Sequence, residues 1–112
     1  MVEQRRYPRY AVPFKIGYSS PGTNGALSPT VAVNVSRTGI RMPVSDNIKI
    51  RDRLHIEIDL LDKNRPVKAV GRVVWVRNNG VTGLTAGIRI TKLGFIDSSR
   101  LLAALLRSKP LV

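Results

Sequence analysis

The sequence predicts a mainly β protein, a small six-stranded antiparallel barrel followed by one α-helix. Three observations lead to this prediction. Apolar and polar residues alternate along most of the chain, as in strands that bury one face. Clusters of turn-forming residues separate the alternating stretches. Near the end of the chain the pattern changes to a helical period. A chain of 112 residues can build one hydrophobic core and little more.

Six stretches carry the strand pattern: 11–18, 30–36, 39–43, 53–61, 67–77 and 84–91. The first places four apolar side chains on one face: Val12, Phe14, Ile16 and Tyr18. The alternation is clearest in 53–61. The stretch 67–77 has β-branched residues on both faces, which indicates a strand covered partly on its second side. Asn78-Asn79-Gly80 after it is typical of a hairpin turn.

The stretches 30–36 and 39–43 predict a hairpin with polar groups at its tip. Three valines alternate on the side that we expect to face the core: Val31, Val33 and Val35. Asn34 and Ser36 then lie on the opposite, exposed face. The strand ends at Arg37, and we expect Gly39 to supply the positive φ of a tight turn.

The helix is predicted at about 95–108. Four leucines form an apolar helical stripe: Leu101, Leu102, Leu105 and Leu106. Asp97 or Ser98 can cap the start of the helix, and Pro110 ends it.

The first ten residues are expected to form a flexible basic arm, with 11–112 as the single domain. Three arginines lie within the arm, at Arg5, Arg6 and Arg9. Pro8 disfavours helix at the residue before it, so the arm is extended or turned. Such arginines can be a solvated terminus. They can also pair with phosphates or fork onto a guanine edge.

The arm and the hairpin together resemble the PilZ domain family, bacterial receptor modules for cyclic di-GMP. That family carries an R-x-x-x-R arm followed by [D/N]-x-S-x-x-G. Here the arm motif spans Arg5–Arg9 and the second motif spans Asn34–Gly39. The resemblance continues through GRVVWVR at 71–77 and TAGIRIT at 85–91. It covers nearly the whole chain.

The resemblance implies a set of residues that contact the ligand: Arg5, Arg9, Asn34, Ser36 and Gly39. Arg6 and Arg37 are further candidates, although a solvated turn arginine is an equal interpretation of Arg37. Trp75 lies two residues after Val73 and therefore on the same strand face, so core packing is the default expectation for its indole. A base-stacking role beside the site is the alternative.

The charge balance sets the classes of partner. The formal net charge is +12, and thirteen of the nineteen basic residues are Arg. Such an excess favours polyanions: nucleic acid, an anionic membrane surface or an acidic protein. The two phosphates of one cyclic di-GMP do not account for it.

Other classes are not expected. Without cysteine there are no disulfides or thiolate metal sites. His55, the sole histidine, sits on a polar strand face and does not make a zinc site. No nucleophile elbow, P-loop or dinucleotide fingerprint occurs, so neither an enzyme nor a cofactor is predicted. No membrane span or secretory signal is visible, and a cytoplasmic location is expected.

The leading hypothesis is therefore a cyclic di-GMP receptor. Its arm would order on the barrel when the ligand binds, and the changed surface would relay the level of this second messenger to a downstream protein partner, for which an acidic protein is a candidate. Two alternatives stay open. One is a small basic β-barrel that binds nucleic acid, although aromatic residues are only 5% of the chain. The other is a PilZ-like adaptor that binds protein and no nucleotide.

Overall fold

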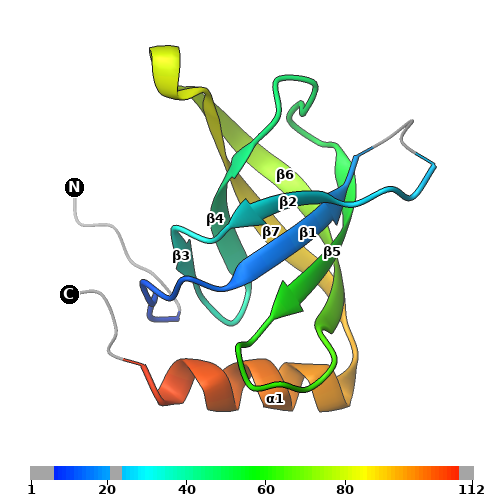
Figure 1. Ribbon diagram of the computed structural model, residues 1–112, viewed down its shortest axis with the longest axis vertical. Coiled ribbons are helices and arrows are strands. Elements are labelled where there is room, and N and C mark those ends of the chain that lie inside the picture. The colour runs from blue at the N-terminus through cyan, green and yellow to red at the C-terminus, as the bar shows by residue number, and fades with distance from the viewer. Residues whose placement is uncertain (1–6, 21–23, 109–112) are drawn as a thin grey trace.

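The computed structural model describes residues 7–20 and 24–108. Seven strands, a short 3-10 helix and one α-helix follow one another along the chain (Figure 1). Their bounds are β1 Lys15–Ser19, β2 Ser28–Val31, β3 Asn34–Val35, β4 Gly39–Val44, β5 Arg53–Asp59, β6 Val67–Asn78, η1 Gly80–Thr82, β7 Leu84–Leu93 and α1 Phe95–Leu106.

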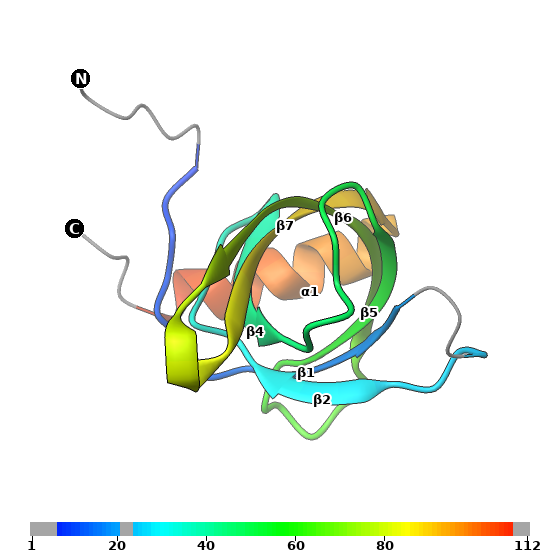
Figure 2. The ribbon, with the colours of Figure 1, turned by 90° about the horizontal axis from the view of Figure 1, so that it is seen from above.

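The strands form one antiparallel sheet in the order β2-β1-β5-β6-β7-β4-β3. The sheet curls until its two edges meet, and the Thr30 hydroxyl donates to the Pro43 carbonyl oxygen across the seam at 2.8 Å. Figure 2 shows the strands around a common interior with α1 beyond one end. Leu101 and Leu105 of α1 are fully buried and belong to the barrel core.

The predicted fold class is confirmed, with seven strands in place of six. The additional strand arises because the stretch expected at 30–36 divides into β2 and β3. At the junction the Ala32 N–H donates to the Phe14 carbonyl at 3.0 Å, whereas the Val33 N–H donates to the Arg41 carbonyl at 2.7 Å. The chain thus passes from one edge of the sheet to the other and covers the seam.

The expected core face of this stretch is wrong at two of its three valines. Val35 is buried opposite Ile40, but Val31 and Val33 are 48% and 45% exposed. The change of partner strand shifts the alternation by one residue, so that Ala32 points inward instead. The alternation of apolar and polar residues in the sequence does not reveal such a change of partner strand.

The helix begins and ends close to its predicted bounds, but neither expected residue caps it. Gly94 is the N-cap, and no side chain caps the first turn. Asp97 instead accepts a hydrogen bond from the Lys68 backbone N–H at 3.1 Å and pairs with Arg100 at 3.2 Å. It therefore fastens the helix to β6. No described helix is long and apolar enough to span a bilayer.

The described end of the arm lies against the barrel. Tyr10, the last residue assigned to the arm, is buried and exchanges two backbone hydrogen bonds with Val35 of β3. Residues 1–6 lie outside the described part of the chain. Whether residues 1–10 are flexible as a unit stays a prediction.

Candidate functional site

A bulge in β6 turns Trp75 outward. Val73 lies opposite Ile88 in β7, but Trp75 lies opposite Gly87, so one extra residue is inserted in β6 between the two pairs. Val73 remains in the core, whereas Trp75 is only half-buried and absent from the core cluster. The default expectation of core packing for Trp75 is therefore wrong, because the bulge reverses the alternation of the strand.

Gly87 leaves the space that the indole occupies. A Cβ at this position would overlap Trp75 Nε1 and the neighbouring ring carbons. The guanidinium carbons of Arg41 and Arg77 each lie 5.6 Å from the centre of the Trp75 ring. This distance is within the range of cation–π attraction. The ring is thereby held on the outer face of the sheet between two arginines.

Strand register aligns the site in one row. Trp75 of β6 is opposite Gly87 of β7, Gly87 is opposite Arg41 of β4, and Arg41 is opposite Asn34 of β3. Directly opposed residues share a face of the sheet. Asn34, the first residue of the second motif, and the indole of Trp75 therefore lie on the same side of the barrel. The Arg41 Nε–H is buried and meets no acceptor within the described residues.

Arg9 joins the arm to this row. Its Nη1 donates to Asn34 Oδ1 at 2.9 Å, and Asn34 is buried beneath it. Arg9 also lines a pocket of about 180 Å³ on the same face. The other lining residues come from β4, β6, β7 and the motif turn: Thr38, Gly39, Ile40, Val74, Trp75, Gly87, Ile88 and Arg89.

Ser36 and Gly39 shape the motif turn. The Ser36 N–H donates to the Gly39 carbonyl at 2.9 Å, and the Ser36 hydroxyl oxygen accepts from the Thr38 N–H at 3.2 Å. The expected positive φ at Gly39 is wrong, because this residue begins β4 with ordinary strand geometry. Glycine is favoured there for space, since a Cβ would lie 3.1 Å from the Ile88 carbonyl oxygen.

The other predicted arginines divide between two outcomes. Arg37 stacks on Tyr7, with its guanidinium carbon 4.8 Å from the ring centre, and does not line the pocket. This contact is a second link between the arm and the motif turn. Arg5 and Arg6 lie outside the described residues.

The structure adds three arginines that the sequence analysis did not single out, namely Arg41, Arg77 and Arg89. A signal was present for Arg41 and Arg89, each of which stands between two apolar residues. Arg89 stands between the apolar residues Ile88 and Ile90, so its side chain had to point away from the core. Their convergence on Trp75 and the pocket depends on register and on the bulge, which sequence alternation does not define.

Chemically, the face suits a planar, phosphorylated ligand. It combines a half-buried aromatic ring on the outer surface, forked guanidinium donors and one carboxamide. No group of three or more His, Cys, Asp or Glu side chains within the described residues is placed to hold a metal ion.

Comparison with known proteins gives a consistent result. The family model described as the PilZ domain matches residues 3–107. No curated protein sequence matches the chain significantly. The solved structures that resemble it share 18% sequence identity or less in the three cases described next, so they establish the fold alone.

An inhibitor of motility from Bacillus subtilis (MotI/DgrA) superposes with a TM-score of 0.78 at 18% identity, over 95% of this chain and 51% of that one. The PilZ domain of Escherichia coli YcgR with c-di-GMP gives 0.70 at 11%, over 95% and 92%. The K. pneumonia MrkH–c-di-GMP complex gives 0.69 at 12%, over 96% and 52%. The chain thus spans about half the length of two of these proteins.

Proposed function

Because the chain belongs to the PilZ domain family, we propose that it is a receptor for cyclic di-GMP. The observation that carries this proposal is the position of Trp75. Its indole lies on the outer face of the barrel, in register with the motif residue Asn34 and beside the pocket that Arg9 lines. Two solved structures with similar folds, the PilZ domain of YcgR and MrkH, hold this dinucleotide.

In the proposed complex one guanine stacks on Trp75 and enters the pocket. The volume of about 180 Å³ is below the range of roughly 300–1,000 Å³ typical of sites that enclose a drug-sized ligand. The pocket therefore takes one base, and the rest of the dinucleotide lies along the surface. Arg5 and Arg9 of the arm pair with phosphate or with guanine O6 and N7.

Ligand binding then competes with the contact between Arg9 and Asn34. In the free protein Asn34 Oδ1 accepts from Arg9. A guanine edge that uses this oxygen releases the guanidinium, which becomes available to the ligand. The arm residues move with Arg9, and the changed surface is what a downstream protein partner recognises. The protein acts in this way as a bacterial, cytoplasmic binding module without catalysis.

A calorimetric titration tests the proposal. Cyclic di-GMP is expected to bind with saturable heat, whereas cyclic di-AMP is expected to bind much more weakly. Adenine carries an amino group in place of guanine O6, and an arginine fork cannot donate to it. The absence of binding by cyclic di-GMP would favour the nucleotide-free adaptor. Equal binding of both dinucleotides would reject guanine recognition by the arm.

A further inference from the structure

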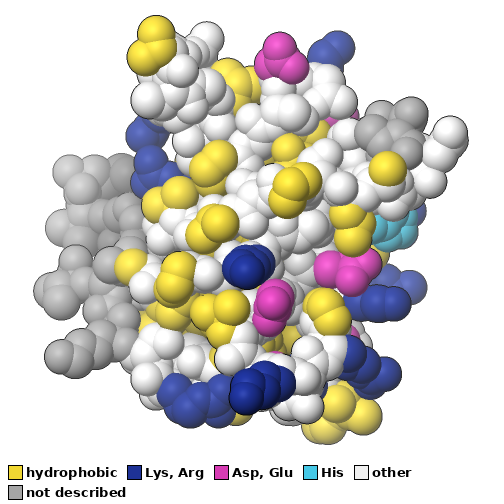
Figure 3. All heavy atoms as spheres, viewed as in Figure 1, with side chains coloured by type: hydrophobic (Ala, Val, Ile, Leu, Met, Phe, Trp, Pro, Cys, Tyr) yellow, Lys and Arg dark blue, Asp and Glu magenta, His cyan; other side chains and the backbone are white. Residues whose placement is uncertain are grey.

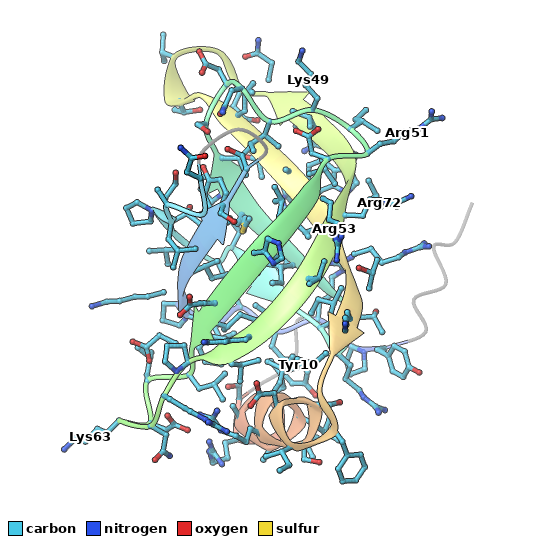
Figure 4. The ribbon with its side chains drawn as sticks, turned by 90° about the vertical axis from the view of Figure 1, so that its right-hand side faces the viewer. Tyr10, Lys49, Arg51, Arg53, Lys63 and Arg72 are labelled. Carbon is cyan, nitrogen blue, oxygen red and sulfur yellow. The ribbon has the colours of Figure 1, made fainter. Side chains whose placement is uncertain are left out.

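A second concentration of charge lies on the outer surface of β5, β6 and β7 and on the loop before β5. We call it the basic face and define it by seven exposed residues: Lys49, Arg51, Arg53, Lys68, Arg72, Arg89 and Lys92. Figure 4 shows Lys49, Arg51, Arg53 and Arg72 along one side of the barrel. The β1–β2 side differs, because hydrophobic side chains gather over it (Figure 3). Leu27, Val31 and Val33, which belong to β2 or lie near its ends, are exposed.

Three arginines of the basic face are directly opposed across adjacent strands. Arg53 of β5 is opposite Arg72 of β6, and Arg72 is opposite Arg89 of β7. Neighbouring strands are about 4.8 Å apart, and like charges directly opposite one another destabilise a sheet. These three side chains form no ion pair with a carboxylate of the described chain. The row therefore lowers the folding stability without internal compensation.

Arg51 extends this row under backbone strain. Its φ is +78°, a left-handed conformation that Gly or Asn adopts at lower cost. The Arg51 N–H donates to the Val73 carbonyl at 2.8 Å, which anchors the residue to β6 one position from Arg72. A charged residue thus stands where local conformation favours a small one, as Lys63 with a φ of +66° also does in the loop after β5. The position of Arg51 beside the arginine row is therefore what makes it part of the face.

The lower part of the basic face is also positive. Lys92 is opposite Val70, which is opposite His55, and these residues with Arg53 and Lys68 line a hollow of about 290 Å³. In β5, β6 and β7 the carboxylates occur only near the end of β5, at Glu57 and Asp59. Asp52 stands between Arg51 and Arg53 in the loop before β5, and its Oδ2 accepts from the Lys49 N–H at 2.9 Å. The seven basic residues still outnumber these three carboxylates, so the face is positive overall.

We propose that the basic face binds the phosphate backbone of double-stranded nucleic acid without reading its sequence. A polyphosphate supplies closely and regularly spaced charges, and arginine forks fit phosphate oxygens. Trp75 is the only Phe, Tyr or Trp in β5, β6 and β7, and it lies at the edge of the face beside Arg89, so the face offers one stacking platform where single strands stack successive bases on several. It is built from strands and lacks the amphipathic helix of a membrane-surface site. The proposal does not depend on cyclic di-GMP binding.

The test is fluorescence anisotropy of the full chain with a labelled DNA duplex at several salt concentrations. A duplex of roughly 20 base pairs, at about 3.4 Å each, is longer than the 38 Å protein. If about four phosphates are contacted, the affinity is expected to fall about 150-fold between 50 and 200 mM salt, because the logarithm of the affinity changes by about −0.9 per contact for each unit of log salt.

Matched variants test the location. Arg53→Gln with Arg72→Gln removes two charges from the basic face and is expected to reduce the salt slope by about 1.8. Lys63→Gln with Arg107→Gln removes the same charge from exposed positions outside the basic face and is expected to leave the slope unchanged. A duplex that does not bind at 50 mM salt, or equal effects of the two pairs, would overturn the proposal. A third outcome would assign the face to a membrane instead. In that case the wild type does not bind the duplex but binds anionic phosphatidylglycerol vesicles, and the Arg53/Arg72 double variant loses the vesicle binding.

Arg51→Gly provides a test that separates binding from folding. The substitution relieves the strained backbone and removes a charge, so the thermal midpoint is expected to rise while duplex affinity falls several-fold. A rise in the midpoint with unchanged duplex affinity would remove Arg51 from the site. If the thermal midpoint and the duplex affinity both fall, the variant damages the fold. The salt slopes of the two double variants would then decide the proposal.

Discussion

Substitution of Gly87 by Ala tests whether Trp75 is the platform for a guanine. The added Cβ would overlap the indole at Nε1 and at the adjacent carbons. The indole cannot move inward, because the backbone of β7 lies beneath it. It must therefore swing outward, away from Arg41 and Arg77 and from the pocket. The substitution displaces the ring without replacing any side chain that is proposed to contact the ligand.

The structure gives the expected magnitudes. Loss of stacking on one base costs about 1–3 kcal/mol, which corresponds to a roughly 5- to 150-fold loss of cyclic di-GMP affinity. The free energy of unfolding falls by about 1–2 kcal/mol for two lost cation–π contacts. About 0.5–1 kcal/mol of this is offset because alanine is favoured over glycine within a strand. Affinity should therefore fall by more than stability.

Calorimetric titration and thermal unfolding measure the two quantities on the same sample. Gly94→Ala is the matched control, because a Cβ at Gly94 meets nothing within 4 Å and its φ is negative. This variant should bind like the wild type. If Gly87→Ala also binds like the wild type while its unfolding midpoint falls, the indole is displaced without consequence and Trp75 is not part of the site.

Three further predictions concern the arm, the motif and the ligand charge. Arg9→Ala should weaken cyclic di-GMP binding by about 2 kcal/mol or more, the scale of a charge-assisted contact, and Arg5→Ala should have the same effect. If calorimetry gives either variant the affinity of the wild type, the arginine replaced in it is not part of the site. Asn34→Asp strengthens the competing contact from Arg9 as well as the bonds to a guanine edge, each by about 1 kcal/mol. Because the guanine edge offers two donors to the carboxylate, binding should still become tighter, whereas Asn34→Ala should weaken it. Equal weakening by both Asn34 variants would mean that the side chain does not accept from a guanine edge. Finally, cyclic di-GMP affinity should depend only weakly on salt because few charges are neutralised, and a steep dependence would indicate a polyanion site instead.

The sequence predicted those features that depend on local patterns. Alternation located the strands with long regular faces, such as β5, and the helical stripe located α1. The family resemblance assigned Arg9 and Asn34 to one ligand site, and the structure brings these two side chains into direct contact. The strands and the helix follow from short-range sequence patterns, and the pairing of Arg9 with Asn34 follows from the family motifs.

The errors occur where tertiary structure shifts the alternation. The passage of the chain across the barrel seam at Ala32 and Val33 puts Val31 and Val33 out of phase with Val35, although one uninterrupted alternation had placed all three on the same face. The bulge before Trp75 placed on the surface a ring that its spacing from Val73 assigned to the core. Each shift is one residue long, and a one-residue shift reverses every side chain that follows. Such shifts depend on partner strands, which the sequence pattern does not define.

The most direct test of the proposed site is a map of amide and indole chemical shifts on adding cyclic di-GMP. Trp75 is the only tryptophan, so its indole N–H gives one assignable signal at the centre of the site. We expect saturable shifts of this signal and of the Asn34, Gly39 and Gly87 amides, with α1 unaffected. Saturable shifts confined to the basic face, with the Trp75 indole unchanged, would contradict the account.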